Sequence, residues 1–507
     1  MKNIARLIVG IALLVFRPAP TAAQLHLTTI TEIQQGNLPG KSPSDLRTAY
    51  HQMNLDYTAG DLRFGLRGEG FAASRSGRDY GHLAQRFVHY RRGRLQLEAG
   101  HFYAILGSGL LLHAYELPGV VTQERGSRRR YQLTRDLDGF HLRYRWSQVD
   151  LRLFQGTPVD SGLPPGLEGV DRREGTIRGG GLLLRPLDLT EVGIGAMHAQ
   201  RGGEEELDIT THIRLRLRPG AAYAEIYGEY AQRDATLDRW FSLDRELPRA
   251  LYLSTTATWG PWGMSLEYKD YRDFLIVDVN NPPPLIREHD AFLLNRLTHD
   301  LLPDDETGSQ LELTRSFPGG QTLIANLTDA TRRQLRGNDD DEKLRELFLQ
   351  FDSPLGESLY ARFFVDRTRS QIPRKDERHF TLGSGLDWQV GSSYALNADL
   401  QFQDVDRRFG DLEFPFTNLY LNLGMSRGEG GSLSLLLQRS TDNLETGASP
   451  SGKTLWWGVN AGWEVHYGHR LDLFAGKRRS GLACSAGTCH EVLGFEGIEI
   501  RLLDQWF

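Results

Sequence analysis

The chain has 507 residues, of which 39% are hydrophobic, 10% aromatic and 24% charged, and its formal net charge is −6. Apolar residues recur along the whole chain, which excludes general disorder. Beyond the N-terminus no apolar run reaches the roughly 18–20 residues that a membrane-spanning helix needs, and the acidic balance leaves no basic footprint for nucleic acid.

The first 23 residues have the three parts of a secretory signal. Lys2 and Arg6 precede an apolar run from Leu7 to Phe16, and small residues end at Ala22-Ala23. We therefore predict a signal peptide over residues 1–23, cleaved near Ala23. The alternative is a membrane anchor, which the shortness of the apolar run disfavours. Cleavage would leave 56 basic and 65 acidic residues, a net charge of −9, in an exported protein.

Residues 24–507 alternate between apolar and polar positions in segments of about ten residues, each bounded by turn residues. Phe140–Trp146, for example, reads FHLRYRW, with an aromatic or apolar residue at every second position. Soluble sandwiches and propellers also alternate. These segments, however, are about 9–13 residues long, which is longer than the usual soluble strand of about 5–6 residues and matches a tilted crossing of the bilayer. The chain also ends in Trp506-Phe507, an aromatic terminus of the kind read by outer-membrane assembly machinery, although Phe507 is out of phase unless a bulge re-phases it.

Short turns alternate with longer polar gaps along this region. Short turns are expected at Thr58–Asp61, Arg91–Gly93, Ser147–Gln148, Arg218–Gly220, Trp259–Trp262, Pro318–Gly320, Ser353–Gly356, Gly391–Ser393, Arg427–Gly430 and Tyr467–His469. Longer gaps are expected at Ala72–Gly81, Thr157–Arg173, Gln232–Pro248, Thr331–Glu342, Arg369–Glu377 and Thr441–Lys453.

Consecutive strands must alternate in direction, and this parity sets the strand count. If every short turn is periplasmic, Leu25–Ile33 must be the first outward strand, and residues 103–137 and 273–305 must each be one excursion. The count is then roughly 24 strands, with 22–26 acceptable, because bacterial barrels have even numbers. We predict an all-β fold: a single large antiparallel transmembrane β-barrel over residues 24–507, with inward-folded loops.

The tryptophans agree with this arrangement, because aromatic girdles mark both interfaces of a membrane barrel. Trp146, Trp259, Trp262, Trp388 and Trp506 fall beside the expected short-turn ends, whereas Trp240, Trp456 and Trp457 fall near the expected outer ends.

The segment Ala99–Glu116 resembles a motif of uncharacterised large outer-membrane β-barrels, a porin-like group without an assigned function. The matching positions are Gly100, Phe102, Tyr103, Leu106, Gly107, Gly109, Leu110, Tyr115 and Glu116. Tyr268–His289 and the Cys-x4-Cys loop before the last strand are similar to the same group. The resemblance implies an outer-membrane barrel and no particular activity; porins and TonB-dependent receptors are more distant comparisons.

Charged residues on the polar strand faces are candidate lumen residues, because an arginine facing lipid at the bilayer midplane would cost about 2–4 kcal/mol. This pattern has two interpretations. The charged residues form a selectivity lining, or they are ion-paired side chains that fill and stiffen the barrel. The candidates are Arg63, Arg67, Arg143, Arg145, Arg214, Arg216, Glu225, Glu229 and Glu267.

The excursion at 103–137 is expected to fold into the lumen and narrow it. Gly107 and Gly109 permit sharp backbone bends, and inward folding would hide the apolar run that starts at Leu110. The basic run that includes Arg125, Arg128, Arg129 and Arg130 is expected to pair with Glu225, Glu229 and Glu267. The alternative is a long external loop that covers a neighbouring barrel.

Other motifs carry weaker expectations. Cys484 and Cys489 are predicted to form a disulfide in the last external loop. Asn281–Pro284 suits a rigid lumenal or cap loop, or an ordinary surface loop. Asn338–Glu342 lacks the spacing of a calcium loop, so a solvated loop is favoured over a cation site. No metal site, cofactor or catalytic motif is predicted; a hydrolase assembled from separate strands is a remote alternative.

The leading functional hypothesis is a passive or gated outer-membrane channel for small hydrophilic solutes, and not an enzyme. About 20 residues precede the second strand, too few for the plug domain of a TonB-dependent receptor. The alternative is a non-conducting scaffold or binding barrel in a surface-assembly or secretion complex. The expected partners are outer-membrane lipid, the assembly machinery and small solutes, without nucleic acid.

Overall fold

The structure is a computed structural model that describes residues 23–38, 45–74, 79–124, 128–160, 165, 171–201, 204–233, 247–276, 278–285, 289–296, 305–333, 341–428, 430–444, 454–485 and 488–506. Of the predicted signal peptide, residues 1–22 lie outside this part of the chain. Within it, no helix is both long and apolar enough to cross a membrane.

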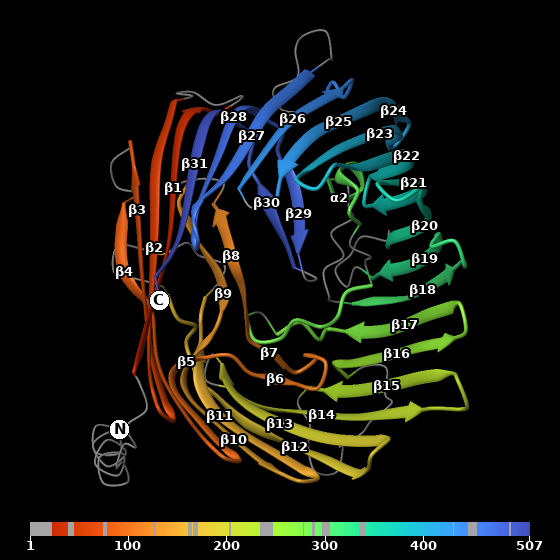
Figure 1. The fold of residues 1–507 in the computed structure, drawn as a ribbon. Helices are drawn as coiled ribbons and strands as arrows, with labels where there is room; N and C mark the ends of the chain where they lie inside the picture. Colours follow the sequence, from red (N-terminus) through yellow and green to blue (C-terminus); the bar gives the residue numbers. More distant parts are fainter. Residues whose placement is uncertain are drawn as a thin grey trace.

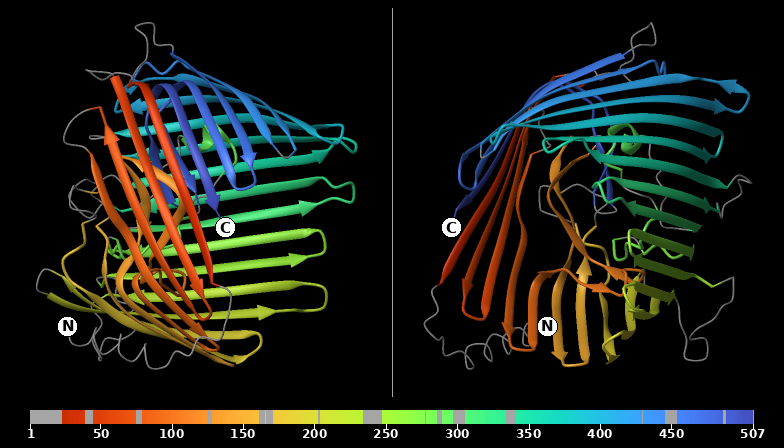
Figure 2. Two further views of the ribbon diagram at one scale, coloured as in Figure 1. Left: turned by 60° about the vertical axis from the view of Figure 1, so that its left-hand side comes forward. Right: turned by 45° about the vertical axis from the view of Figure 1, so that its right-hand side comes forward.

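The described chain forms one large antiparallel sheet that curls into a closed barrel (Figures 1 and 2). Its strands are β1 (Gln24–Asn37), β2 (Asp45–Ala59), β3 (Leu62–Ala73), β4 (Tyr80–Arg92), β5 (Leu95–Phe102), β10 (Leu137–Trp146), β11 (Val149–Pro158), β12 (Ile177–Leu187), β13 (Thr190–Arg201), β14 (Glu204–Leu217), β15 (Tyr223–Gln232), β16 (Arg249–Trp259), β17 (Trp262–Arg272), β18 (Glu306–Ser316), β19 (Thr322–Arg332), β20 (Glu342–Pro354), β21 (Leu359–Ile372), β22 (Lys375–Val390), β23 (Tyr394–Phe409), β24 (Leu412–Glu413), β25 (Phe416–Arg427), β26 (Gly431–Ser440), β27 (Thr454–His466), β28 (His469–Arg478) and β31 (Phe495–Trp506).

Each strand pairs with its neighbours, and the first and last strands close the ring, with Leu27 opposite Trp506 and Asn37 opposite Glu496. The sheet has 25 described strands; because β24 is a two-residue extension of the β23 hairpin, the barrel wall has 24. The prediction of a closed antiparallel barrel with about 24 strands is confirmed. Across the two expected excursions, β5 pairs directly with β10 and β17 with β18.

The two faces of the wall differ as the alternation predicts. Leu66, Leu153 and Leu327 point outward and are exposed, whereas Gln52, Asp150 and Asp366 point inward and are buried. Period-two alternation places every second side chain on the same face, so a strand that reads FHLRYRW must have one apolar and one charged side. The result is an apolar exterior and a polar interior, the surface pattern of a barrel in lipid.

Several turns differ from the expectations. Arg369–Glu377 is not a long gap: β21 and β22 continue through it to a two-residue turn, with Ile372 opposite Lys375. Its polar sequence obscured the strands, which are held by the Arg369–Asp376 ion pair at 3.0 Å. A further short turn, between Leu187 and Thr190, escaped the sequence analysis.

The aromatic pattern also needs two corrections. Trp456 is buried on the inner face, where the Arg479 guanidinium lies 5.0 Å from its ring, so it is not a girdle residue. The last strand contains no bulge, because its register against β1 and β28 is continuous. Asp504 therefore stays on the outer face, where Oδ1 lies 2.9 Å from His469 Nδ1 and Oδ2 accepts a hydrogen bond from Thr29 at 3.3 Å.

Three insertions occupy the ring of strands (Figure 1). The first, between β5 and β10, contains β6 (Ile105–Leu106), β7 (Leu112–His113), β8 (Tyr115–Gln123) and β9 (Arg130–Arg135). The second, between β17 and β18, contains the helix α2 (Phe292–Arg296). The third, between β28 and β31, is the hairpin of β29 (Gly481–Ser485) and β30 (Thr488–Val492), which contacts α2 and β8.

Candidate functional site: the narrowed lumen

The β6–β7 hairpin, Ile105–His113, projects into the lumen as a small tongue whose tip binds one carboxylate of the wall. Glu229 of β15 accepts hydrogen bonds from the backbone N–H of Ser108 at 2.6 Å and from its hydroxyl at 2.5 Å. Thr210 and Tyr227 donate to the same carboxylate at 2.8 and 2.6 Å. Glu229 is buried, so these four donors compensate the cost of removing its charge from water.

The backbone at the tip requires glycine. Gly107 has a φ of +58° and Gly109 a φ of +98°, a region that other residues rarely adopt. A Cβ on Gly107 would also lie 2.2 Å from a carboxylate oxygen of Glu229. The turn can therefore approach the wall closely only because position 107 has no side chain.

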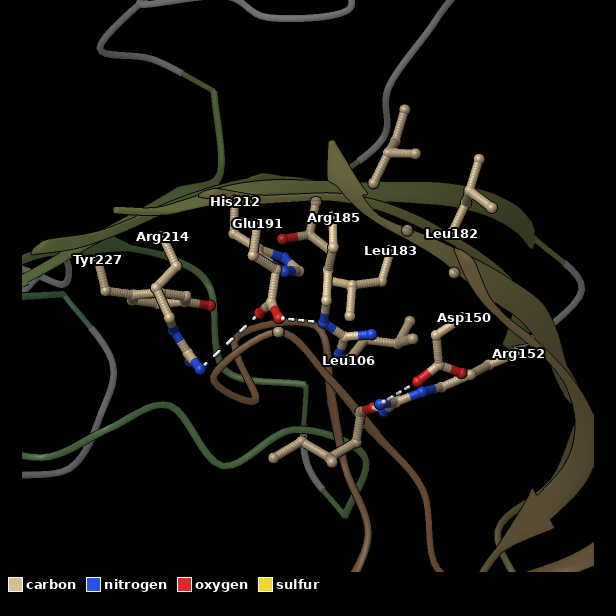
Figure 3. Close-up of a pocket in the computed structure, with 16 residues that line it drawn as sticks. Leu106, Asp150, Arg152, Leu182, Leu183, Arg185, Glu191, His212, Arg214 and Tyr227 are labelled. Carbon is tan, nitrogen blue, oxygen red and sulfur yellow. Dashed lines mark hydrogen bonds and ion pairs between the residues drawn. The ribbon is translucent and has the colours of Figure 1, made fainter. Parts of the chain in front are cut away.

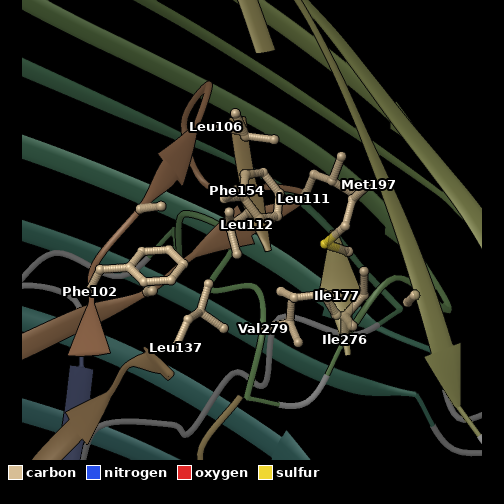
Figure 4. Packing of buried hydrophobic residues seen from close by; sticks show 13 residues of the cluster. Phe102, Leu106, Leu111, Leu112, Leu137, Phe154, Ile177, Met197, Ile276 and Val279 are labelled. Carbon is tan, nitrogen blue, oxygen red and sulfur yellow. The ribbon is translucent and has the colours of Figure 1, made fainter. Parts of the chain in front are cut away.

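The apolar run after the tip is hidden inside the barrel. Leu110 packs in a cluster with Tyr227, Tyr271 and Phe274. Leu111 and Leu112 belong to a second cluster that includes Phe154 and Met197 of the wall (Figure 4). All three leucines are fully buried, which explains how an apolar run is accommodated in a polar lumen.

The first two insertions are bound to each other across the lumen. Ile276 and Val279 of the second insertion belong to the same cluster as Leu111 and Leu112. Asn280 donates its side-chain amide to the carbonyl of Leu110 at 2.8 Å, and His113 N–H donates to the carbonyl of Val279 at 2.9 Å. Burial lowers the pKa of His113. The tongue is therefore supported from two sides.

A row of alternating charges lines the wall beside the tongue, from β10 to β15. The Asp150 carboxylate accepts a hydrogen bond of 2.9 Å from Arg143 Nε, and it lies 3.4 Å from the guanidinium group of Arg152. Further along, Glu191 lies 3.1 Å from Arg185 and 3.8 Å from Arg214. Glu225 then lies 3.5 Å from Arg214 and 2.9 Å from Arg216. We call these eight residues the charged row.

A cavity of about 250 Å³ lies between the tongue and this wall (Figure 3). Its charged lining comes from the row: Arg152, Arg185, Arg214, Asp150 and Glu191. Leu106 of the tongue closes one side and packs on the wall where Gly181 and Gly195 have no side chains; a Cβ at these positions would lie 2.9 and 3.2 Å from it.

The basic residues of the first insertion bind different partners from those predicted. Arg130 of β9 forms ion pairs with Glu32 of β1 and, at 2.8 Å, with Glu499 of β31, not with Glu225, Glu229 or Glu267. The arginine is buried. Closure of the barrel brings Glu32 and Glu499 together, and the spacing along the chain gives no sign of this.

The neighbouring basic residues do not reach the predicted carboxylates either. Arg129 donates to the carbonyl of Pro165 at 3.2 Å, and Arg128 is buried with a φ of +64° and donates its backbone N–H to the carbonyl of Glu124. Arg125 lies outside the described residues.

The other predicted lumen residues lie away from the cavity. Arg67 forms an ion pair with Glu116 of the first insertion at 2.6 Å, and Arg63 pairs with Asp56 at 2.8 Å on an exposed part of β3. Glu267 accepts a hydrogen bond from Tyr252 at 3.1 Å, and Arg145 is exposed.

Three residues of the charged row were not among the predicted candidates: Asp150, Arg185 and Glu191. Asp150 and Glu191 are each the second residue of a strand that begins after a short turn. The alternation along each strand places them on the inward face, so it could have identified them. Arg185 was missed because it follows the apolar run Leu182–Leu184. The glycines before that run have no side chains, so the alternation of polar and apolar residues cannot be followed there.

The cysteine segment is not an external loop. β29 and β30 turn into the barrel, and their register places Cys484 directly opposite Cys489 (Figure 1). The side chains of both cysteines lie outside the described part, so the disulfide stays a prediction. The Asn281–Pro284 segment also lies in the lumen, where the Pro283 carbonyl accepts a hydrogen bond from Tyr271 at 3.0 Å. Residues 338–340 lie outside the described ranges.

A family model described as a family of unknown function, DUF6029, matches residues 28–329, more than half of the chain. The chain belongs to this family. The matched DUF6029 span runs from β1 into β19 and includes the charged row, the tongue and the second insertion. The resemblance to an uncharacterised family is therefore confirmed; two of the three segments on which it rested lie within this span, and the cysteine segment lies outside it. No curated protein matches the sequence.

The chain is also similar to solved structures of Pseudomonas proteins, one of them described as a porin. OccK5 (OpdH) of Pseudomonas aeruginosa is 14% identical with a TM-score of 0.40, over 76% of this chain and 98% of that one. OpdQ of the same organism is 12% identical, with a TM-score of 0.41 over 76% and 99%. A BenF-like porin from Pseudomonas fluorescens Pf-5 is 13% identical, with a TM-score of 0.40 over 81% and 98%. Similarity this low does not indicate a function. The function has to be inferred from the structure of this barrel.

Proposed function

We propose that this protein is a porin-like channel in the outer membrane of a Gram-negative bacterium and conducts small hydrophilic solutes. The observation that carries the proposal is a closed wall of 24 strands with an apolar exterior and a charged interior. A barrel of this size encloses a lumen that must hold water or a plug. The insertions leave an open charged cavity of about 250 Å³ beside the tongue, which favours a narrowed channel.

The tongue is proposed to be the constriction of this channel. It crosses from β5 to Glu229 on β15, six strands further round the wall, and reduces the space in front of the charged row. The charged row is proposed to set the selectivity; it contains the sequence candidates Arg143, Arg214, Arg216 and Glu225, of which Arg214 lines the cavity.

The test is single-channel conductance of the refolded mature chain in a planar bilayer. The tongue can be excised cleanly, because Ala114 N–H donates to the Ala104 carbonyl at 2.9 Å, so that residues 105–113 can be replaced by Gly-Gly. We expect wild-type protein to conduct and the excised variant to conduct more. Replacing the Pro373–Arg374 turn by the same Gly-Gly linker is the control and should leave the conductance unchanged.

The second candidate function is a non-conducting scaffold or binding barrel in a surface-assembly or secretion complex. It is favoured by the contacts of all three insertions with one another, since β30 contacts β8 and β29 contacts α2. A folded wild-type barrel that passes no current, with an excised variant that passes none either, would support the scaffold and contradict the channel. A conducting wild type whose conductance does not change on excision would show that the tongue is not the constriction.

A further inference from the structure

The charged row presents the cavity with hydrogen-bond donors and few free acceptors. Each of its three carboxylates is shared between two arginines, and the part of the row that lines the cavity has three arginines and two carboxylates. A guanidinium group has five N–H donors, more than these pairs use. Among the described residues, the side chain of Arg185 donates only one hydrogen bond, from Nε to Glu191. The two terminal nitrogens of its guanidinium group are therefore available to a ligand.

Among the residues that line the cavity, the two carboxylates are less accessible than the three arginines. The Asp150 side chain is fully buried and that of Glu191 is 10% exposed, whereas those of Arg152, Arg185 and Arg214 are 24%, 41% and 33% exposed. A cation entering the cavity would meet guanidinium groups before it met a carboxylate. An anion would meet donors that are already held in place by their ion pairs, so little side-chain entropy would be lost on binding.

Further groups complete a mixed lining. Leu106 and Ile105 of the tongue provide an apolar side, and Tyr227 lies under Arg214, whose guanidinium is 5.0 Å from the ring. His212 also lines the cavity, and its buried Nδ1 has no hydrogen-bond partner among the described residues. The volume of about 250 Å³ leaves room for a small organic molecule.

We infer that this cavity is a binding subsite for a small organic carboxylate. The planar guanidinium groups of Arg185 and Arg214 match a carboxylate in a bidentate manner, and the apolar side formed by Leu106 accommodates a short hydrocarbon part. The inference rests on the proposed channel function for its purpose, since the ligand would be a solute on its path through the lumen.

Binding can be measured separately from conduction. We would titrate the detergent-solubilised mature chain calorimetrically with valerate, with its neutral isostere valeramide and with inorganic phosphate. Valerate is expected to bind and valeramide to bind at least about tenfold more weakly, because it lacks the charge-assisted hydrogen bonds. Equal affinity for the acid and the amide, or no binding of valerate, would overturn the inference. Phosphate binding as tight as valerate would show a general anion site and overturn the assigned ligand class.

Variants then locate the site. Arg185→Gln and Arg214→Gln are each expected to weaken valerate binding about tenfold or more. Arg185→Lys keeps the charge but loses the planar fork, so it should give an intermediate affinity. The matched control is Arg362→Gln on β21, an equally exposed lumenal arginine paired with Asp352 at 3.2 Å, which should bind valerate like the wild type. Each variant is checked for folding by its altered gel mobility before heating.

Two readouts keep the claims separate. A folded protein that binds valerate but passes no current would contradict the proposed channel and leave the subsite standing. A protein that conducts but whose valerate affinity is insensitive to Arg185→Gln and Arg214→Gln would contradict the subsite and leave the channel standing.

Discussion

At the scale of single residues, the docking of the tongue depends on one glycine and one carboxylate. Gly107 and Glu229 were both identified from the sequence, but as a flexible position and a lumen-lining charge. Period-two alternation determines which face a side chain occupies, and it contains no information on which distant residue it meets. The contact between residues 107 and 229 exists because β5 and β15 lie on different parts of one closed ring.

The change Gly107→Ala should release the tip of the tongue. Gly93→Ala is a matched control, because Gly93 has a φ of +57° in a short turn where a Cβ would meet nothing within 4 Å. Both substitutions carry the backbone cost of about 1–2 kcal/mol for a side chain in the left-handed region. Only Gly107→Ala also forces a Cβ to within 2.2 Å of Glu229. Conductance should rise for Gly107→Ala and not for Gly93→Ala; the same behaviour in both variants would contradict tip docking.

At the scale of elements, the β8–β9 hairpin is attached to the wall where the first and last strands meet. Arg130 joins Glu32 to Glu499, and Arg501 of β31 donates to the Gly119 carbonyl of β8 at 2.6 Å. The alternation of strand directions predicted an inward excursion here, a pattern that depends only on the positions of the turns. It could not locate the partners of Arg130, because the closing pair of strands is formed by the two ends of the chain.

Replacing Arg130 by Met should destabilise the barrel strongly. Breaking a buried ion pair by removing one partner costs about 3–5 kcal/mol, because buried charge is left behind. Glu32 and Glu499 would keep only their longer pairs with Arg501 and Arg478, at 3.5 and 3.4 Å. The Arg345–Asp329 pair lies on the outward face of β19 and β20, near their loop ends, with side chains that are 74% and 50% exposed, and Arg345→Met should cost at most about 1 kcal/mol. The temperature at which each variant loses its folded gel mobility measures the difference; equal temperatures would refute the role assigned to Arg130.

The β29–β30 hairpin is expected to contain a disulfide between Cys484 and Cys489. Opposed positions of an antiparallel pair have Cα atoms about 4.5–5.5 Å apart, within the range that a disulfide bridges. Closing a ring this short should stabilise the protein by about 2 kcal/mol. Both cysteines should resist alkylation in the unreduced, denatured protein and react after reduction. Alkylation without reductant would disprove the bond, and a Cys484→Ser, Cys489→Ser variant should still form a barrel.

At the scale of the whole molecule, fold class and strand number followed from the sequence because they depend on local patterns: alternation, segment length and turn spacing. Arg369–Glu377 was misassigned because a polar strand end and a polar loop have the same composition. The cavity was not predictable, because it is formed by β11–β15 and a tongue that arises elsewhere in the chain.

The intact protein should fractionate with the outer membrane and migrate faster on a gel before heating than after it. Long two-faced strands and an apolar exterior require a lipid environment, because that exterior would aggregate in water. Circular dichroism should show a β-rich spectrum with little helix. A protein recovered as a soluble periplasmic species, or a spectrum dominated by helix, would contradict the membrane assignment.

The position of the β8–β9 hairpin has a consequence for the order of events during biogenesis. Arg130 contacts both the first and the last strand from the inside, and β29–β30 lies beside β8 within the same ring. Once β1 and β31 have paired, these segments are enclosed by the wall and cannot be introduced through it. The interior must therefore be in place, or still threading through an open end, when the two ends of the chain meet, so the β1–β31 pairing belongs to the late steps of assembly.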